Sequence, residues 1–114
     1  MPPVPPQLFQ GTLDVLILQT LLGGPRHGYA IAEWLETTTE GDVQIEDAAL
    51  YTALHKMEDR GWVESEWGLS GKGKRAKFYR LTSRGRAQLR TRVNEWHRYV
   101  ASIGRVLGAI PQQA

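Results

Sequence analysis

The chain has 114 residues and a mass of 12.8 kDa, the size of one domain. It contains no cysteine, which excludes disulfides and thiolate sites. It has no apolar run of about 20 residues, which excludes a membrane span. Its formal charge of +2 hides a segregation: residues 67–94 carry nine basic residues and no acidic one, whereas acidic residues outnumber basic ones elsewhere. This clustering favours a polyanion such as nucleic acid as partner, with a solvated basic hairpin and helix face as the alternative.

The N-terminal part of the chain predicts a short lead-in and one buried helix. Residues 1–7 include four prolines and no basic residue, so we expect a disordered lead-in rather than a signal peptide, and a cytoplasmic location. The first helix begins near Thr12, a good N-cap, and is apolar on more than one face, as in a mostly buried helix. Gly23, Gly24 and Pro25 end it.

Two further helices are expected before the middle of the chain. The second runs roughly from His27 to Thr38 and is expected to bury Tyr29, Ile31, Ala32 and Leu35. After a polar loop, the third is capped by Asp47 and ends at Arg60, with Gly61 as its stop. Helical spacing puts one stripe of this helix in the core, namely Leu50, Ala53, Leu54 and Met57. The opposite side carries Tyr51, Thr52, His55, Lys56 and Asp59.

A β-hairpin and a long helix are expected to follow. The extended runs at 62–67 and 76–81 contain aromatic and β-branched residues, and a glycine-rich basic stretch separates them. Thr82 or Ser83 then caps a helix that reaches about Leu107 and carries an a/d seam, made by Leu89, Val93, Trp96, Val100, Ile103, Leu107 and Ile110. So long a seam favours a homodimer interface, because a monomer would expose it, with packing inside the monomer as the alternative.

Three helices followed by a hairpin are typical of a winged helix-turn-helix, a mostly α (α+β) fold. We expect this domain over residues 8–82, a dimerisation helix over 83–110 and a tail over 111–114. In such a domain the third helix enters the major groove and the hairpin, or wing, meets the DNA backbone. The candidate DNA contacts are therefore Tyr51, Thr52, His55 and Lys56 on the helix, and Lys72, Lys74, Arg75 and Lys77 on the wing.

Several motifs in order resemble those of the PadR family of transcriptional regulators. They are Gly11–Leu18 (GTLDVLIL), Gly24–Ile31 (GPRHGYAI), Leu50–Leu54 (LYTAL), Glu58–Gly61 (EDRG), Trp67–Gly68 (WG) and Tyr79–Thr82 (YRLT). The resemblance runs from about Leu8 to Leu107, and the single C-terminal helix is similar to the shorter branch of the family. It implies a dimeric repressor of nearby genes, often for stress response, efflux or detoxification.

The resemblance also implies roles for individual residues. Some members of the family release DNA when a phenolic acid or a flat hydrophobic drug binds, and a central tryptophan on the last helix can flank such a ligand. Trp96 and Tyr99 are therefore a candidate ligand site. Tyr51 is retained as a phosphate or base contact. The chain departs from the family at Ala48-Ala49, where Gly-Ser or Gly-Thr is usual, so a hydroxyl contact to phosphate is lost, and at Thr52, which replaces proline.

Other interpretations remain open at this stage. Tyr51 could pack on the first helix with only its hydroxyl exposed, and Lys56 could belong to a solvated face of mixed charge. At most two of the last helix's arginines (Arg84, Arg86, Arg90 and Arg92) can face one partner. The three histidines are scattered and no catalytic motif is present, so we expect no metal, no cofactor and no enzyme. The rival functions are a protein-docking module and an architectural DNA binder without an effector.

Overall fold

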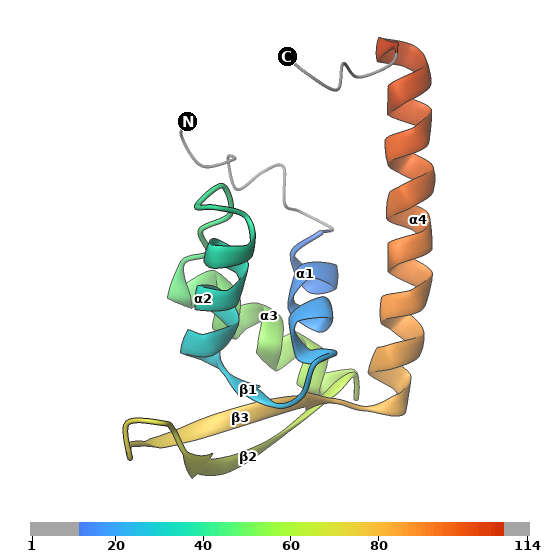
Figure 1. The fold of residues 1–114 in the computed structure, drawn as a ribbon. Coiled ribbons are helices and arrows are strands. Elements are labelled where there is room, and N and C mark those ends of the chain that lie inside the picture. The colour runs from blue at the N-terminus through green and yellow to red at the C-terminus, as the bar shows by residue number, and fades with distance from the viewer. Residues whose placement is uncertain (1–11, 109–114) are drawn as a thin grey trace.

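The computed structural model describes residues 12–108, which form helices α1 (Leu13–Leu21), α2 (Gly28–Thr38), α3 (Asp47–Asp59) and α4 (Ser83–Leu107), and strands β1 (Arg26–His27), β2 (Val63–Leu69) and β3 (Arg75–Leu81). Helices α1, α2 and α3 lie over one face of a small sheet; the β2–β3 hairpin projects from one side, and α4 rises beside α1 (Figure 1). This arrangement confirms the mostly helical winged-helix fold. Within these residues no helix is long and apolar enough to cross a membrane.

Some of the expected segments fall outside residues 12–108. They are the lead-in at 1–7, the last residues of the 83–110 helix with Ile110, and the tail at 111–114. The remaining boundaries moved by one or two residues. Glu46 rather than Asp47 is the N-cap of α3, which ends at Asp59, and the strands of the hairpin are Val63–Leu69 and Arg75–Leu81.

The sheet has three antiparallel strands in the order β1–β3–β2, where the sequence predicted a two-stranded hairpin. Strand β1 is only two residues long, too short for any alternation of apolar and polar residues to reveal it. The glycine-rich turn after α1, with Gly24 at φ +133°, carries the chain to the edge of β3. Across the hairpin, Ser65 pairs with Tyr79 and Trp67 with Lys77.

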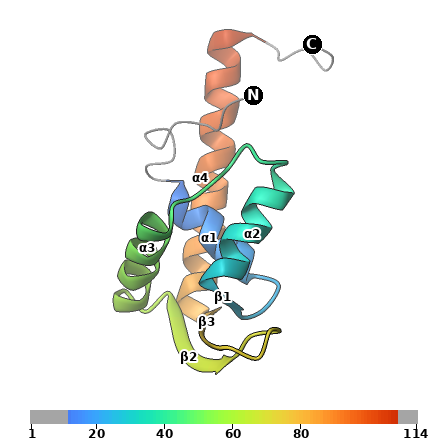
Figure 2. The same cartoon turned by 90° about the vertical axis from the view of Figure 1, so that its left-hand side faces the viewer.

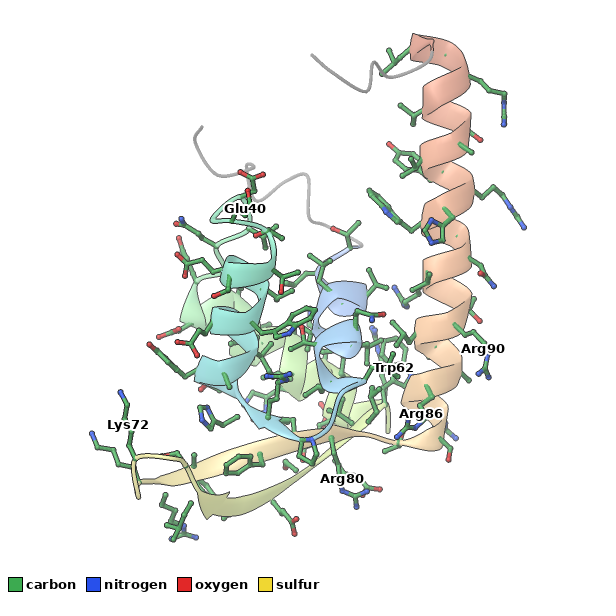
Figure 3. All side chains as sticks on the ribbon, viewed as in Figure 1. Glu40, Trp62, Lys72, Arg80, Arg86 and Arg90 are labelled. Carbon is green, nitrogen blue, oxygen red and sulfur yellow. The ribbon has the colours of Figure 1, made fainter. Side chains whose placement is uncertain are left out.

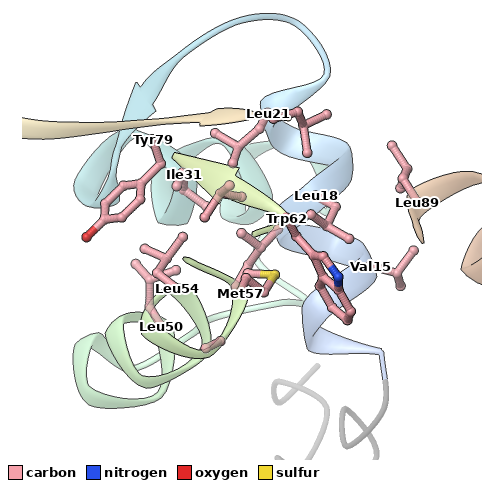
Figure 4. Packing of buried hydrophobic residues seen from close by; sticks show 14 of the residues in the cluster. Val15, Leu18, Leu21, Ile31, Leu50, Leu54, Met57, Trp62, Tyr79 and Leu89 are labelled. Carbon is pink, nitrogen blue, oxygen red and sulfur yellow. The ribbon is translucent and has the colours of Figure 1, made fainter. Parts of the chain in front are cut away.

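The core lies between the three N-terminal helices and the sheet (Figure 4). Each helix contributes its apolar stripe; α3 buries the predicted set, Leu50, Ala53, Leu54 and Met57. Helix α2 buries Ile31 and Leu35, but Tyr29 is 68% exposed, so its predicted burial is wrong. The reason is geometric: Tyr29 precedes Ile31 by two residues, or about 200° around the helix.

The start of α4 is tied to the turn between α3 and β2. The Thr82 hydroxyl accepts a hydrogen bond from the Gly85 amide at 3.0 Å and donates to the Gly61 carbonyl at 2.6 Å. Gly85 packs against the backbone carbonyl of Trp62, where a Cβ has no room. Leu89 is 5% exposed and belongs to the core, and Val93 packs against that core. The prediction that a monomer would expose Leu89 is therefore wrong, and the free part of the seam begins at Trp96.

Candidate nucleic-acid interface

Helix α3 presents a small, mildly charged surface to solvent. Its predicted contact residues, Tyr51, Thr52, His55 and Lys56, are all exposed, because the buried stripe lies on the other side of the helix. Ala48 and Ala49 precede them and are exposed as well. Short side chains at the start of the helix let its backbone approach a partner closely. The helix itself supplies shape and hydrogen-bonding groups, while most of the positive charge comes from elsewhere.

That charge comes from the hairpin, across a groove from α3. The groove has a volume of about 840 Å³ and lies between the first turn of α2, the side of α3 and the hairpin. Figure 2 looks toward this side of the molecule, with α3 and α2 above the β2–β3 hairpin. Six of the eight predicted contacts line the groove: Tyr51, His55, Lys72, Lys74, Arg75 and Lys77. Thr52 and Lys56 lie on the exposed side of α3, outside the groove lining.

A tight turn exposes the cations at the end of the hairpin. The Ser70 amide donates to the Lys74 carbonyl at 2.8 Å, and Gly73, with φ +75°, allows the chain to reverse. Lys72, Lys74 and Arg75 are exposed, and Figure 3 places Lys72 at the free end. The Arg75 guanidinium lies 4.6 Å from the centroid of the Trp67 ring. This contact holds one cation of the tip against a flat, exposed aromatic surface.

Lys77 differs from the cations of the tip. It lies on β3, two residues after Arg75, is a third exposed, and its Nζ is 3.9 Å from Oε1 of Glu58 on α3. The second oxygen of Glu58 accepts a hydrogen bond from the Ser65 hydroxyl at 2.6 Å. Beside this group, burial and the nearby charges of Glu58 and Tyr51 raise the pKa of Tyr79 above its ordinary value of 10.0. Lys77 is therefore an ion-pair partner within the chain.

The other basic residues lie away from the groove. Strand β3 carries the chain from the tip to α4, so Arg86 and Arg90 lie at the opposite end of the sheet from Lys72 (Figure 3). Arg80 pairs with Glu64, and the Arg84 guanidinium donates to the Arg60 carbonyl at 3.3 Å. The guanidinium carbons of Arg60 and Arg92 lie 5.1 Å and 5.0 Å from the Trp62 ring centroid. The basic stretch of the sequence is thus divided between two surfaces.

Sequence reasoning missed the aromatic part of the groove. His27, Tyr29 and Trp67 also line it. The His27 ring meets Phe78 edge to face at 5.3 Å, and its Nδ1 accepts from the Ala30 amide at 3.2 Å, which caps α2. Two signals were available: the spacing of Tyr29 from Ile31, and the alternation of β2, which puts Trp67 on the side of Val63 and Ser65.

The outer end of α4 carries an exposed apolar face. Its residues are Trp96, Tyr99, Val100, Ile103, Val106 and Leu107, all exposed in the single chain. The rings of Trp96 and Tyr99 lie 5.8 Å apart at a 33° tilt. Val106 and Tyr99 widen this face beyond the predicted a/d seam. A continuous apolar surface of this kind is typical of a protein–protein contact.

Comparison with known proteins points to one family. The family model described as "Transcriptional regulator PadR-like family" matches residues 17–91, from α1 into α4. A PadR family transcriptional regulator from Eggerthella lenta is 33% identical, with a TM-score of 0.76 over 91% of this chain and 88% of its own. A transcriptional regulator from Clostridium thermocellum is 26% identical, with a TM-score of 0.82 over 90% of this chain and 99% of its own. "Uncharacterized protein X" from Lysinibacillus sphaericus is 35% identical over 89 residues, 78% of this chain and 82% of its own.

Proposed function

The chain belongs to the PadR-like family of transcriptional regulators, which are not enzymes, and we propose that it is a homodimeric repressor that binds a two-fold symmetric DNA operator. Family membership gives DNA binding and transcriptional regulation. Dimerisation, sequence selectivity and repression are the finer parts of the proposal. A regulator of this kind acts where the DNA lies, so we assign it to the cytoplasm.

The groove between α3 and the hairpin is the observation that carries the DNA-binding part. In this groove, Tyr51 and His55 of α3 lie near the tip of the hairpin. The α3 side chains can reach base edges, and the tip cations Lys72, Lys74 and Arg75 can neutralise phosphates. Phosphate contacts supply affinity that does not depend on sequence, and base contacts supply selectivity. We assign base contacts to Thr52 and His55 and backbone contacts to the tip of the hairpin. Tyr51, in the groove, and Lys56, outside it, are assigned further contacts to the DNA.

The exposed face of α4 supports the dimer. Six apolar side chains there are open to solvent in the single chain, and burial of each large one is worth about 1.5–3 kcal/mol. A second copy of the same helix is the occupant we propose, in a two-fold arrangement. Its interface would be made by Trp96, Val100, Ile103 and Leu107, with Val93 at its edge. Such a dimer holds two α3 helices for successive major grooves, which requires a separation of about 34–36 Å.

We further propose that a planar aromatic molecule can release the DNA. Trp96 and Tyr99 lie side by side at the inner end of the exposed α4 face, and two such faces suit stacking on a flat ring. A ligand there would lie between the two α4 helices of the dimer, each of which carries one DNA-binding domain. It can release DNA only through a difference in its affinity for the free and the bound dimer. Trp96→Ala should abolish release by phenolic acids or planar dyes, measured at a protein concentration at which sedimentation shows that the variant is still a dimer.

The experiment that tests the proposed function is footprinting on the protein's own promoter, followed by fluorescence anisotropy with that duplex and a scrambled one. We expect protection of a palindromic site, tighter binding of the promoter duplex and a steep loss of affinity with salt. Equal binding of both duplexes would instead identify an architectural DNA binder. No salt-dependent binding to any duplex would leave a protein-docking module as the better explanation.

A further inference from the structure

One carboxylate connects the recognition helix to both strands of the hairpin. Glu58, in the last turn of α3, accepts a hydrogen bond from the Ser65 hydroxyl of β2 through one oxygen, at 2.6 Å. Its other oxygen lies 3.9 Å from Nζ of Lys77 on β3. Both side chains of the ion pair are about one-third exposed, so the pair lies at the edge of the molecule and can be altered without opening the core.

The register of the hairpin shows that Glu58 contacts both of its paired strands, so these contacts fix the hairpin as a whole relative to α3. Ser65 pairs with Tyr79, and Trp67 pairs with Lys77, so Ser65 and Lys77 lie two rungs apart on the same face of the β2–β3 ladder. Alternation along a strand puts Lys77 on the same face as the buried Tyr79, the face that meets α3. Nζ of Lys77 also lies 5.9 Å from the centroid of the Tyr79 ring. Two contacts thus hold the ammonium group, one from Glu58 on α3 and one from the Tyr79 ring on β3.

Within residues 12–108, no side-chain hydrogen bond or ion pair joins the hairpin to α3 beyond Lys77. The tip cations, Lys72, Lys74 and Arg75, are exposed, and the sequence from Trp67 to Asn94 contains no carboxylate to pair with them. The pair Glu58–Lys77 has no net charge, so it releases no counterion from DNA. If Lys77 turned to a phosphate, the Glu58 carboxylate would be left unpaired beside that phosphate, which is unfavourable.

We propose that Glu58, Ser65 and Lys77 form a bridge that sets the angle between the recognition helix α3 and the wing, the β2–β3 hairpin. In this bridge Lys77 pairs with Glu58 and does not bind a DNA phosphate. The inference rests on the proposed DNA-binding function. It makes Glu58 and Ser65 positioning residues for DNA recognition, and it replaces the predicted role of Lys77 as a phosphate contact. The remaining wing contacts are those of the tip.

Salt dependence of DNA binding separates a bridging Lys77 from a phosphate-binding one. The plot of log affinity against log salt has a slope of about −0.9 for each phosphate neutralised. Glu58→Gln keeps an oxygen for Ser65 but releases Lys77, so the slope should steepen by about 0.9. In Glu58→Gln/Lys77→Gln the slope should return to the wild-type value. Glu66→Gln makes the same charge change on exposed β2 without a lysine to release, and should leave the slope unchanged.

The opposite pattern overturns the proposal. If Lys77 already binds a phosphate, Glu58→Gln keeps the wild-type slope and the double variant loses about 0.9 from it. Lys72→Gln removes an exposed tip cation, and the change in its salt slope shows how much one phosphate contact contributes in the same assay. A wild-type protein that binds no duplex at any salt concentration would overturn the proposed function instead, so the two failures are distinguishable.

Ser65 tests the positioning part on its own. Ser65→Ala removes the hydrogen bond to Glu58 without changing any charge, so we expect an unchanged salt slope but poorer discrimination between the operator and a scrambled duplex. Ser65→Thr keeps the hydroxyl and should restore discrimination. Circular dichroism of each variant checks that the fold is retained. Wild-type discrimination in folded Ser65→Ala would overturn the role of the bridge in setting the wing.

Discussion

The hydroxyl end of the Tyr51 ring, on the recognition helix α3, lies close against Gly28, the first residue of α2. A Cβ placed on Gly28 would be 2.7 Å from Cζ of that ring, closer than two such atoms can approach, and 3.0 Å from Cε1. Gly28 is buried, while Tyr51 keeps part of its surface open to the groove. The absence of a side chain at Gly28 therefore determines where the tyrosine of α3 is held.

Gly28→Ala should displace Tyr51 and disturb the groove. Tyr51 is 41% exposed and can move away from Gly28, so the loss of unfolding free energy should fall at or below the about 1–3 kcal/mol of core overpacking, while DNA affinity should drop; urea unfolding followed by tryptophan fluorescence measures the first. Gly23→Ala is the matched control, because its Cβ would meet its nearest neighbour at an ordinary 3.8 Å. In a Tyr51→Ala background the Gly28→Ala change should cost little; a full cost there would show that the effect does not pass through Tyr51.

The two halves of the basic segment should differ in their effect on DNA binding. Lys72→Ala/Lys74→Ala removes two charges at the tip of the hairpin and should flatten the salt slope by about 1.8, with affinity lost for all sequences alike. Arg86→Ala/Arg90→Ala removes two charges at the other end of the sheet and should change the slope far less (Figure 3). A wild-type slope in Lys72→Ala/Lys74→Ala would mean that the wing is not the backbone contact. Thr52→Ala or His55→Ala should instead alter preference among sequences.

Leu89 and Leu107 should respond differently to truncation, although both fall on the same a/d seam. Leu89 is buried in the single chain, so Leu89→Ala should lower the unfolding free energy by about 2–5 kcal/mol at every protein concentration. Leu107 is exposed in the single chain, so Leu107→Ser should mainly weaken the dimer. Sedimentation over a concentration series reports the second effect, and thermal melts at high and low concentration report the first. A dimer unaffected by Leu107→Ser would move the interface elsewhere.

Tyr79 should make the fold sensitive to alkaline pH. Burial, followed by the charges of Glu58 and Tyr51, raises the pKa of Tyr79 above 10.0 in the folded state, so the unfolded chain loses the proton first as pH rises. The stabilisation is complete below pH 10.0 and is lost as pH rises through the folded pKa. Urea unfolding at a series of pH values should show a smaller alkaline loss for Tyr79→Phe than for wild type. Tyr99→Phe, at an exposed tyrosine, should behave as wild type.

The sequence predicted the helices because each has a long apolar stripe and clear end signals. The α3 stripe from Leu50 to Met57 and the Gly61 stop are local features, and the structure confirms them. Strand β1 and the Gly28–Tyr51 contact were not predictable in this way, because each depends on a segment distant in the chain. Leu89 shows the same limit: its heptad position is visible in the sequence, but whether the core or a partner covers it is not.

The sequence predicted the cations of the candidate site but not the residues that surround them. Lys72, Lys74 and Arg75 follow from a glycine-rich turn, which forces them to the end of a hairpin. Lys77 was grouped with them because it is basic and nearby, yet the two-residue period of β3 aims it at Glu58 on another element. Continuity of charge along the sequence also suggested one surface, whereas β3 spans the sheet and separates the tip from Arg86 and Arg90.

The most direct test of the central claim, that two copies read one operator through α3 and the hairpin, is the phase dependence of binding. Once footprinting has located the site, half a helical turn of DNA is inserted between its two half-sites and affinity is measured by anisotropy; a full-turn insertion is the control for length. Two α3 helices held at a fixed separation should lose most of their affinity with the half-turn insertion. Affinity unchanged by the half-turn insertion would contradict the account.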